Sequence, residues 1–170
     1  MEPQARPLAT EPPADAGESR PARAGWRARR LGIAGLSMVG LPVSLYMLAY
    51  QGGWIKTLAC PFFGKGCERV GRSAHAEHLG VPNAAVGAVG YAALAALALG
   101  AGQAPLEQRR GPSLLLGAIA LGAAGASAVL TWEQKVKVRA WCFWCLLTAG
   151  INAAILPLAL VEAGRALRRR

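Results

Sequence analysis

The strongest constraint on this chain is the distribution of its charged residues, which leaves four long stretches without any Lys, Arg, Asp or Glu. A helix of about 20 apolar residues is enough to cross the hydrocarbon core of a bilayer, and each stretch reaches that length. The stretches are Leu31–Ile55, His78–Leu106, Gly111–Trp132 and Ala140–Val161. They predict an all-α membrane protein, a bundle of four transmembrane helices at roughly 31–50, 82–101, 112–132 and 142–163.

The net charge of +10 at pH 7 is concentrated beside these stretches. Of the 19 Lys and Arg residues, 12 lie in the two termini and in the turn at 102–111, and the rest lie in the loops at 51–80 and 133–140. Cytoplasmic loops of membrane proteins carry an excess of Lys and Arg. The bias therefore predicts that both termini are cytoplasmic, and it explains the charge without a nucleic acid partner.

The segments outside the apolar stretches are short. Residues 1–25 are rich in Pro, Ala, Arg and Glu without apolar periodicity, so we expect a disordered, basic cytoplasmic tail there. The first apolar stretch has the length of a span and a long region before it, so we interpret it as an uncleaved anchor and not as a signal peptide. The membrane domain is expected over 26–165, followed by a second basic cytoplasmic tail at 166–170.

Four cysteines fall at related places in this topology. Cys60 and Cys67 lie in the loop at 51–80, whereas Cys142 and Cys145 open the fourth predicted helix. In a protein with four spans, the loops after the first and the third span lie on the same side of the membrane, whichever way the chain inserts. All four cysteines are therefore expected on one face. The charge bias makes this the extracytoplasmic face, where disulfides persist.

Three kinds of site use four cysteines in this arrangement. The first is a zinc ion held by four thiolates, although Cys60 and Cys67 are too far apart for a zinc knuckle. The second is a non-catalytic membrane scaffold held by two static disulfides. The third is a redox-active centre that relays electrons by thiol–disulfide exchange. We favour the relay and expect no metal, because the pair Cys142 and Cys145 begins a helix, where thiol pKa values are lowered. Cys145 would face the bundle near the lipid headgroups, within reach of a quinone.

One segment carries a more specific pattern: CPFFGKGCERVGRSAHAEHLGVPNAAVGAVGY, residues 60–91. It resembles the signature of the vitamin K epoxide reductase (VKOR) family, which has two loop cysteines, then C-[DE]-x-V-x-x-S, then a G-[IVL]-P turn into the second helix. The matching residues here are Cys67, Glu68, Val70, Ser73, Gly80, Val81 and Pro82. The later C-x-x-C is also similar to that of bacterial members, and the resemblance covers roughly residues 31–163. Quinone-linked oxidases of the DsbB type have the two pairs in the reverse order.

The resemblance implies a quinone-linked oxidoreductase that forms protein disulfides in the bacterial inner membrane. Such an enzyme oxidises a periplasmic thioredoxin-fold (DsbA-like) partner and reduces ubiquinone or menaquinone. Cys60 would exchange with the partner, Cys67 would pass electrons on through a transient disulfide with Cys142, and Cys145 would face the quinone. Some bacterial members carry a fused thioredoxin-like domain. This sequence ends at RALRRR, so the partner is expected to be a separate polypeptide.

The resemblance also implies roles for polar residues near the cysteines. Ser73 matches a serine that forms hydrogen bonds near the active site, with a solvent-facing loop residue as the alternative. Asn83 matches an asparagine that binds the quinone carbonyl, with a helix N-cap as the alternative. The family often has a second carbonyl donor, a tyrosine four residues after the last cysteine, where this chain has Ala149. Asn152, further along the same helix, is assigned to packing.

The segment after the second loop cysteine is expected to form a short lid helix on the bundle. This helix is predicted over residues 67–79, with Val70, Ala74 and Leu79 pointing inward. His75 and His78 lie close to the thiols in the sequence. Both are left out of the catalytic set, because a surface histidine commonly has no further role.

Overall fold

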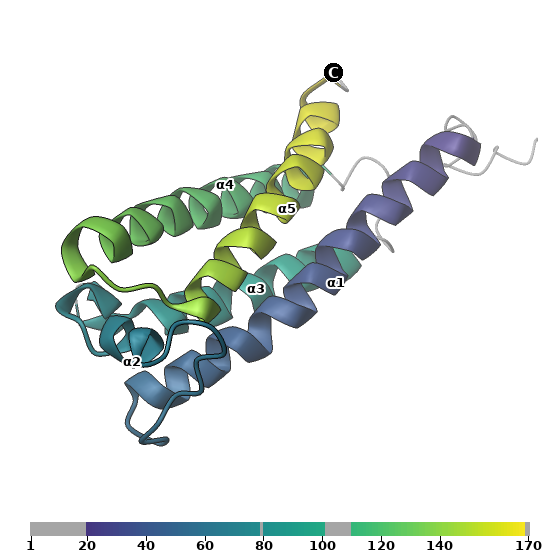
Figure 1. The fold of residues 1–170 in the computed structure, drawn as a ribbon. Coiled ribbons are helices and arrows are strands. Elements are labelled where there is room, and N and C mark those ends of the chain that lie inside the picture. The colour runs from purple at the N-terminus through teal and green to yellow at the C-terminus, as the bar shows by residue number, and fades with distance from the viewer. Residues whose placement is uncertain (1–19, 79, 101–109, 169–170) are drawn as a thin grey trace, which may run out of the picture.

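The computed structural model describes residues 20–78, 80–100 and 110–168, and its main feature is a set of four long helices (Figure 1). These are α1 (Arg20–Gln51), α3 (Asn83–Gly100), α4 (Arg110–Glu133) and α5 (Phe143–Arg168). Within the described residues, four helices are long and apolar enough to cross a membrane. The predicted all-α membrane bundle is thereby confirmed.

The first helix begins earlier than its apolar stretch suggested. α1 starts at Arg20 instead of residue 31, because Ala and Arg in RPARAGWRARR are favourable helix formers that need no apolar face. Residues 20–25 were expected in the disordered tail and are helical here. The remainder of that expected tail, residues 1–19, lies outside the described residues, as does most of the predicted turn at 102–111.

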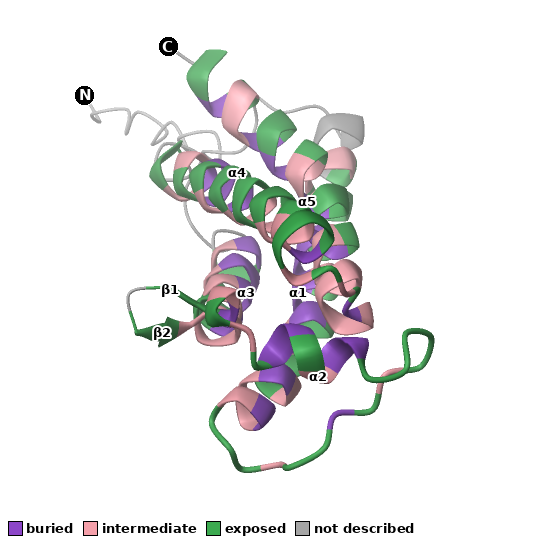
Figure 2. Cartoon of the chain, turned by 60° about the vertical axis from the view of Figure 1, so that its left-hand side comes forward, coloured by how far each residue is buried: buried purple, intermediate pink, exposed green. Residues whose placement is uncertain are grey.

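The helices pack through small residues and an apolar core. α1 packs mainly against α3 and α4 mainly against α5, while further contacts join α1 to α5 and α3 to α4. A side chain at Gly40 would collide with the ring of Tyr91, and one at Gly117 would collide with Ala163. Such close approach is typical of membrane helices, where association depends on backbone proximity and packing. Figure 2 shows buried residues on the facing sides of the helices and exposed residues outside, where lipid would lie.

The connection between α1 and α3 folds over the end of the bundle away from the last turn of α5 (Figure 1). It contains α2 (Gly66–Gly71), the 3-10 turn η1 (Ala74–Ala76) and the two-stranded antiparallel ribbon of β1 (Glu77–His78) and β2 (Val81–Pro82). A short lid helix is therefore confirmed, but it ends at Gly71 instead of continuing to residue 79. Gly71 lies against the ring of Tyr50. Of the residues expected to point inward, Val70 is buried, whereas Ala74 is exposed because the helix has already ended. Leu79 lies outside the described residues.

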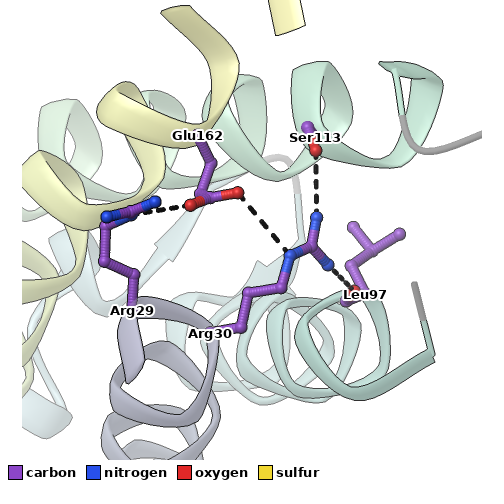
Figure 3. Close-up of polar contacts among 5 residues, drawn as sticks. All are labelled: Arg29, Arg30, Leu97, Ser113 and Glu162. Carbon is purple, nitrogen blue, oxygen red and sulfur yellow. Dashed lines mark hydrogen bonds and ion pairs between the residues drawn. The ribbon is translucent and has the colours of Figure 1, made fainter. Parts of the chain in front are cut away.

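At the other end of the bundle, one buried polar cluster joins all four long helices (Figure 3). Arg29 on α1 donates from Nε to Glu162 Oε1 on α5 at 2.7 Å, and Arg30 Nε lies 3.7 Å from Glu162 Oε2. Arg30 also donates to the Leu97 carbonyl on α3 at 2.8 Å and to Ser113 Oγ on α4 at 2.9 Å. Since buried charges are costly unless paired and hydrogen-bonded, this cluster holds the four helix ends in one arrangement.

Candidate active site

Two of the four cysteines form a disulfide at the lid end of the bundle. Cys60, in the loop that follows α1, is bonded to Cys67 on α2. Cys67 is completely buried, whereas Cys60 is half-buried. The side chain of Glu68 accepts a hydrogen bond from the Leu58 N–H at 3.3 Å. This bond connects α2 to the loop segment directly before Cys60.

Ala59, the residue before Cys60, forms hydrogen bonds to two aromatic side chains through its N–H and its carbonyl group. The Ala59 N–H donates to the Tyr46 hydroxyl at 3.1 Å, and the Ala59 carbonyl accepts from Trp144 Nε1 at 2.6 Å. The rings of Tyr46 and Trp144 also pack edge to face, with their centroids 5.3 Å apart. We call these three residues the Ala59 clamp. It positions Cys60 against the start of α5.

The second pair of cysteines lies where the chain enters α5. α4 continues into a π-helical turn, η3 (Gln134–Val138). The side chain of Gln134 is buried and accepts a hydrogen bond from the Cys142 N–H at 2.8 Å. Cys142 precedes α5 directly and is completely buried, while Cys145 lies in the first turn of the helix. Both are free thiols. The Cys145 N–H donates to Cys142 Sγ at 3.3 Å.

The groups around Cys142 favour the thiolate form of its side chain. A hydrogen bond from the Cys145 thiol is the main cause that lowers the pKa of Cys142 below its ordinary value, and the backbone N–H groups of Cys145 and Trp144 add to it. Burial acts in the opposite direction but is outweighed. A thiolate is the reactive form in disulfide exchange, so Cys142 is suited to act as the nucleophile or as the leaving group.

The lid brings the two cysteine pairs together. Gly66, directly before Cys67, touches the backbone carbonyl of Trp141, directly before Cys142, and leaves no room for a side chain. Cys67 and Cys142 accordingly belong to one buried cluster. The other members of this cluster are Met47, Tyr50, Leu58 and Val70. The close approach of Gly66 to the Trp141 backbone therefore places Cys67, on α2, beside the start of α5.

A largely apolar cavity of about 590 Å³ opens beside Cys145. All four long helices and the lid contribute to its wall. Cys145, Thr148 and Asn152 line it along one face of α5, whereas Cys60, Cys67 and Cys142 are not among its lining residues. Ligand cavities typically have this size and this mixture of apolar walls with a few polar groups. Only one of the four cysteines therefore faces the cavity.

The polar residues suggested by the sequence lie at the lid side of this cavity. Ser73 lines it and donates its hydroxyl to the Val70 carbonyl at 2.8 Å. Asn83 also lines it, donates from Nδ2 to the His75 carbonyl at 2.7 Å and has its Oδ1 2.9 Å from His78 Nδ1. Asn83 thus holds η1 and β1 to the start of α3, and it retains a second amide hydrogen for a ligand. Ala149 is absent from the lining of the cavity, so no contact arises there.

Several residues of the site were not recognised in the sequence. The Ala59 clamp and Gln134 depend on contacts between distant segments, so no local pattern marks them. Asn152 was assigned to packing, yet it lines the cavity and bonds to Ser127 on α4. Its spacing of seven residues from Cys145, about two helical turns, was the available signal that both lie on one face.

In the part of the chain that the structure describes, no group of three or more His, Cys, Asp and Glu side chains could hold a metal ion. The disulfide between Cys60 and Cys67 also removes two of the four thiolates on which the zinc alternative relied. The two remaining sulfur ligands, Cys142 and Cys145, are fewer than the four of a structural zinc site.

Comparison with known proteins agrees with this arrangement. A search of curated proteins finds no match to the chain. The family model of the vitamin K epoxide reductase family matches residues 31–160, which include all four cysteines and most of the chain. The chain therefore belongs to the vitamin K epoxide reductase family and is a multi-pass membrane thiol–disulfide oxidoreductase.

Proposed function

We propose that this protein oxidises a periplasmic thioredoxin-fold (DsbA-like) partner and reduces membrane quinone, and that it thereby supports disulfide bond formation. The observation that carries the proposal is the order of the cysteines in space. The loop disulfide includes the half-buried Cys60, Cys67 and Cys142 share a buried cluster, and Cys145 lines an apolar cavity. This order leads from the outside of the lid to a compartment suited to a lipid-soluble acceptor.

The first exchange takes place at the loop disulfide. A thiolate of the reduced partner attacks Cys60 and releases Cys67 as a thiolate. The partner's second thiolate then attacks the mixed disulfide, and the partner leaves with its own disulfide formed. Two electrons have now moved to Cys60 and Cys67, which are both reduced.

The second exchange carries these electrons to α5. The Cys67 thiolate attacks Cys142 of an oxidised Cys142–Cys145 pair and releases Cys145. Cys60 then attacks Cys67, which restores the loop disulfide and releases Cys142. The products are an oxidised loop pair and a reduced helix pair, which is the combination found in this structure. The lowered pKa of Cys142 favours its release as a thiolate.

The cavity fits the quinone ring. Its walls are largely apolar, and Asn83 and Ser73 offer polar atoms on the lid side. A bound quinone, ubiquinone or menaquinone, supplies an acceptor for the two electrons and two protons that are released when Cys142 and Cys145 form their disulfide. In this proposal Cys145 faces the acceptor, Asn83 donates a hydrogen bond to a ring oxygen, and Ser73 supports the lid beside it.

The charge distribution supports an orientation in a bacterial inner membrane with both termini in the cytoplasm. The cysteines are then extracytoplasmic, on the side where a periplasmic partner is found. Residues 26–165 would form the membrane domain, and the basic segments 1–25 and 166–170 would be cytoplasmic tails. The half-buried Arg29 and the buried Arg30 and Glu162 then lie toward the cytoplasmic end of the bundle.

Thiol trapping in intact membranes tests the proposal. After a pulse of reductant, an alkylating tag that shifts gel mobility reports how fast the cysteines reoxidise, with and without a quinone pool. We expect reoxidation that depends on quinone, and we expect Cys145→Ala to remain reduced. Cysteines that resist the pulse, or that reoxidise equally fast without quinone, would instead support the alternative of a non-catalytic disulfide-stapled scaffold.

A further inference from the structure

A buried polar side chain, Asn152, lies in the middle of α5, away from the lid. Its side chain is only 8% exposed, and it donates from Nδ2 to Ser127 Oγ on α4 at 2.8 Å. Its Oδ1 atom is buried and has no hydrogen-bond partner. Both residues line the cavity that Cys145 faces. A buried amide oxygen without a partner costs free energy, so this atom indicates a ligand that supplies one.

Asn152 lies on the cavity side of α5, deeper in the membrane than the reactive thiol. It follows Cys145 by seven residues, so the two lie on the same helix face and about 10 Å apart along the axis. The side-chain donor between them is already used. Thr148 donates its hydroxyl to the Cys145 carbonyl at 2.9 Å, and Tyr91 donates to the Thr148 carbonyl at 3.1 Å. Of Thr148 and Asn152, only Asn152 has a buried polar atom without a hydrogen-bond partner.

We propose that Asn152, oriented by Ser127, binds the second ring oxygen of the quinone at the inner end of the cavity. This inference rests on the proposed function and extends it to the residues that orient the acceptor. Asn83 binds one oxygen on the lid side, and Asn152 binds the other from α5. The pair of Asn152 and Ser127 thereby supplies the second contact that Ala149 does not provide.

The same pair can serve both redox forms of the ligand. A quinone has two carbonyl acceptors, whereas its reduced form has two hydroxyl groups that also donate. The Ser127 hydroxyl can accept or donate, so it can bond to either end of the Asn152 amide. With one orientation of the amide the oxygen faces the cavity and accepts from the hydroxyl of a quinol. With the other, the NH₂ group faces the cavity and donates to the carbonyl of a quinone.

Equilibrium binding to the purified full-length protein tests this inference. The probes are decyl-1,4-benzoquinone on the oxidised protein and, on the reduced protein, its hydroquinone and the two decylphenols that each lack one ring oxygen. Isothermal titration calorimetry compares wild type with Asn152→Leu, which has the same branched shape and no polar atoms. We expect Asn152→Leu to weaken quinone and hydroquinone by about tenfold, the effect of one hydrogen bond. One decylphenol should lose affinity similarly, and the phenol that lacks the contacted oxygen should bind both proteins equally.

Ser127→Ala provides a second variant that keeps the amide and removes only its orienting partner. We expect a smaller loss of affinity for the quinone, about threefold, with the same pattern between the two phenols. Equal weakening of all four probes by Asn152→Leu would indicate altered packing and overturn the inference, as would unchanged binding of every probe. Both results leave quinone-dependent reoxidation of the wild type in place. A wild-type protein that binds none of the probes would overturn the inference and the proposed function together.

Discussion

Trp144 donates a hydrogen bond of 2.6 Å from its indole nitrogen to the carbonyl oxygen of Ala59, a residue 85 positions earlier in the chain. The donor stands between Cys142 and Cys145, and the acceptor stands directly before Cys60. One side chain thus connects the helix pair of cysteines with the loop pair. Because Tyr46 holds the N–H of the same residue, the backbone that carries Cys60 is held from both sides.

Replacement of Trp144 by Phe should therefore slow electron transfer between the two pairs. The variant keeps an aromatic ring beside Tyr46 and loses the hydrogen bond, which is worth about 1 kcal/mol, so we expect a reduction of about fivefold. Rapid alkylation after mixing with a reduced thioredoxin-fold protein measures the transfer rate. Trp132→Phe is the matched control, since Trp132 is exposed on α4. Equal rates in both variants would show that the clamp does not position Cys60.

A methyl group at Gly66 should separate the two buried cysteines. In Gly66→Ala the new Cβ meets the Trp141 carbonyl, so α2 must move away from the start of α5. We expect a lower yield of the Cys67–Cys142 mixed disulfide, trapped in a background where Cys60 and Cys145 are serine and quantified on a non-reducing gel. Gly125→Ala is the control, because a Cβ at Gly125 meets no atom within 4 Å. An unchanged yield in Gly66→Ala would contradict the proposed route from Cys67 to Cys142.

The pKa of Cys142 should respond to the side chain at position 145. The thiol of Cys145 is the main cause of the lowered pKa, so the Cys142 thiolate persists to lower pH than an ordinary cysteine and is lost as the pH falls through that lowered value. In both Cys145→Ala and Cys145→Ser, with the loop disulfide intact, Cys142 is the remaining free thiol. We expect a higher titration midpoint in the alanine variant, which has no donor, than in the serine variant. Ultraviolet absorbance of the thiolate measures both, and identical midpoints would assign the shift to the backbone N–H groups instead.

Neutralising Glu162 should destabilise the bundle without altering the chemistry at the cysteines. Glu162→Gln removes the buried carboxylate that pairs with Arg29 and Arg30, and breaking a buried ion pair in this way costs about 3–5 kcal/mol. Thermal unfolding in detergent should show a lower midpoint than wild type, while turnover per folded molecule stays the same. Arg165→Gln, an exposed position on the same helix, should unfold like wild type. Loss of turnover in folded Glu162→Gln would show that the cluster acts on the distant thiols.

The lid helix α2 is shorter than its own sequence predicts. Burial of Val70 follows from its place in a short amphipathic segment. α2 ends at Gly71, and this glycine packs against the ring of Tyr50 on α1, which leaves no room for a side chain there. An uninterrupted helix to residue 79 was therefore a reasonable prediction from the segment alone. It was wrong, since α2 ends where Gly71 packs against α1, and the chain continues from there through the short turn η1.

The sequence by itself determined the four membrane spans, the placement of all four cysteines at one end, and the family. These properties depend on the length of uncharged stretches, on the number of membrane crossings and on the spacing of nearby residues. All of these can be read directly along the sequence. The tertiary structure alone decided the Ala59 clamp, the bond from Cys142 to Gln134, and the cavity position of Asn152. Each of these joins residues on different helices, and only the packing of those helices determines which polar atoms meet and which one remains without a partner.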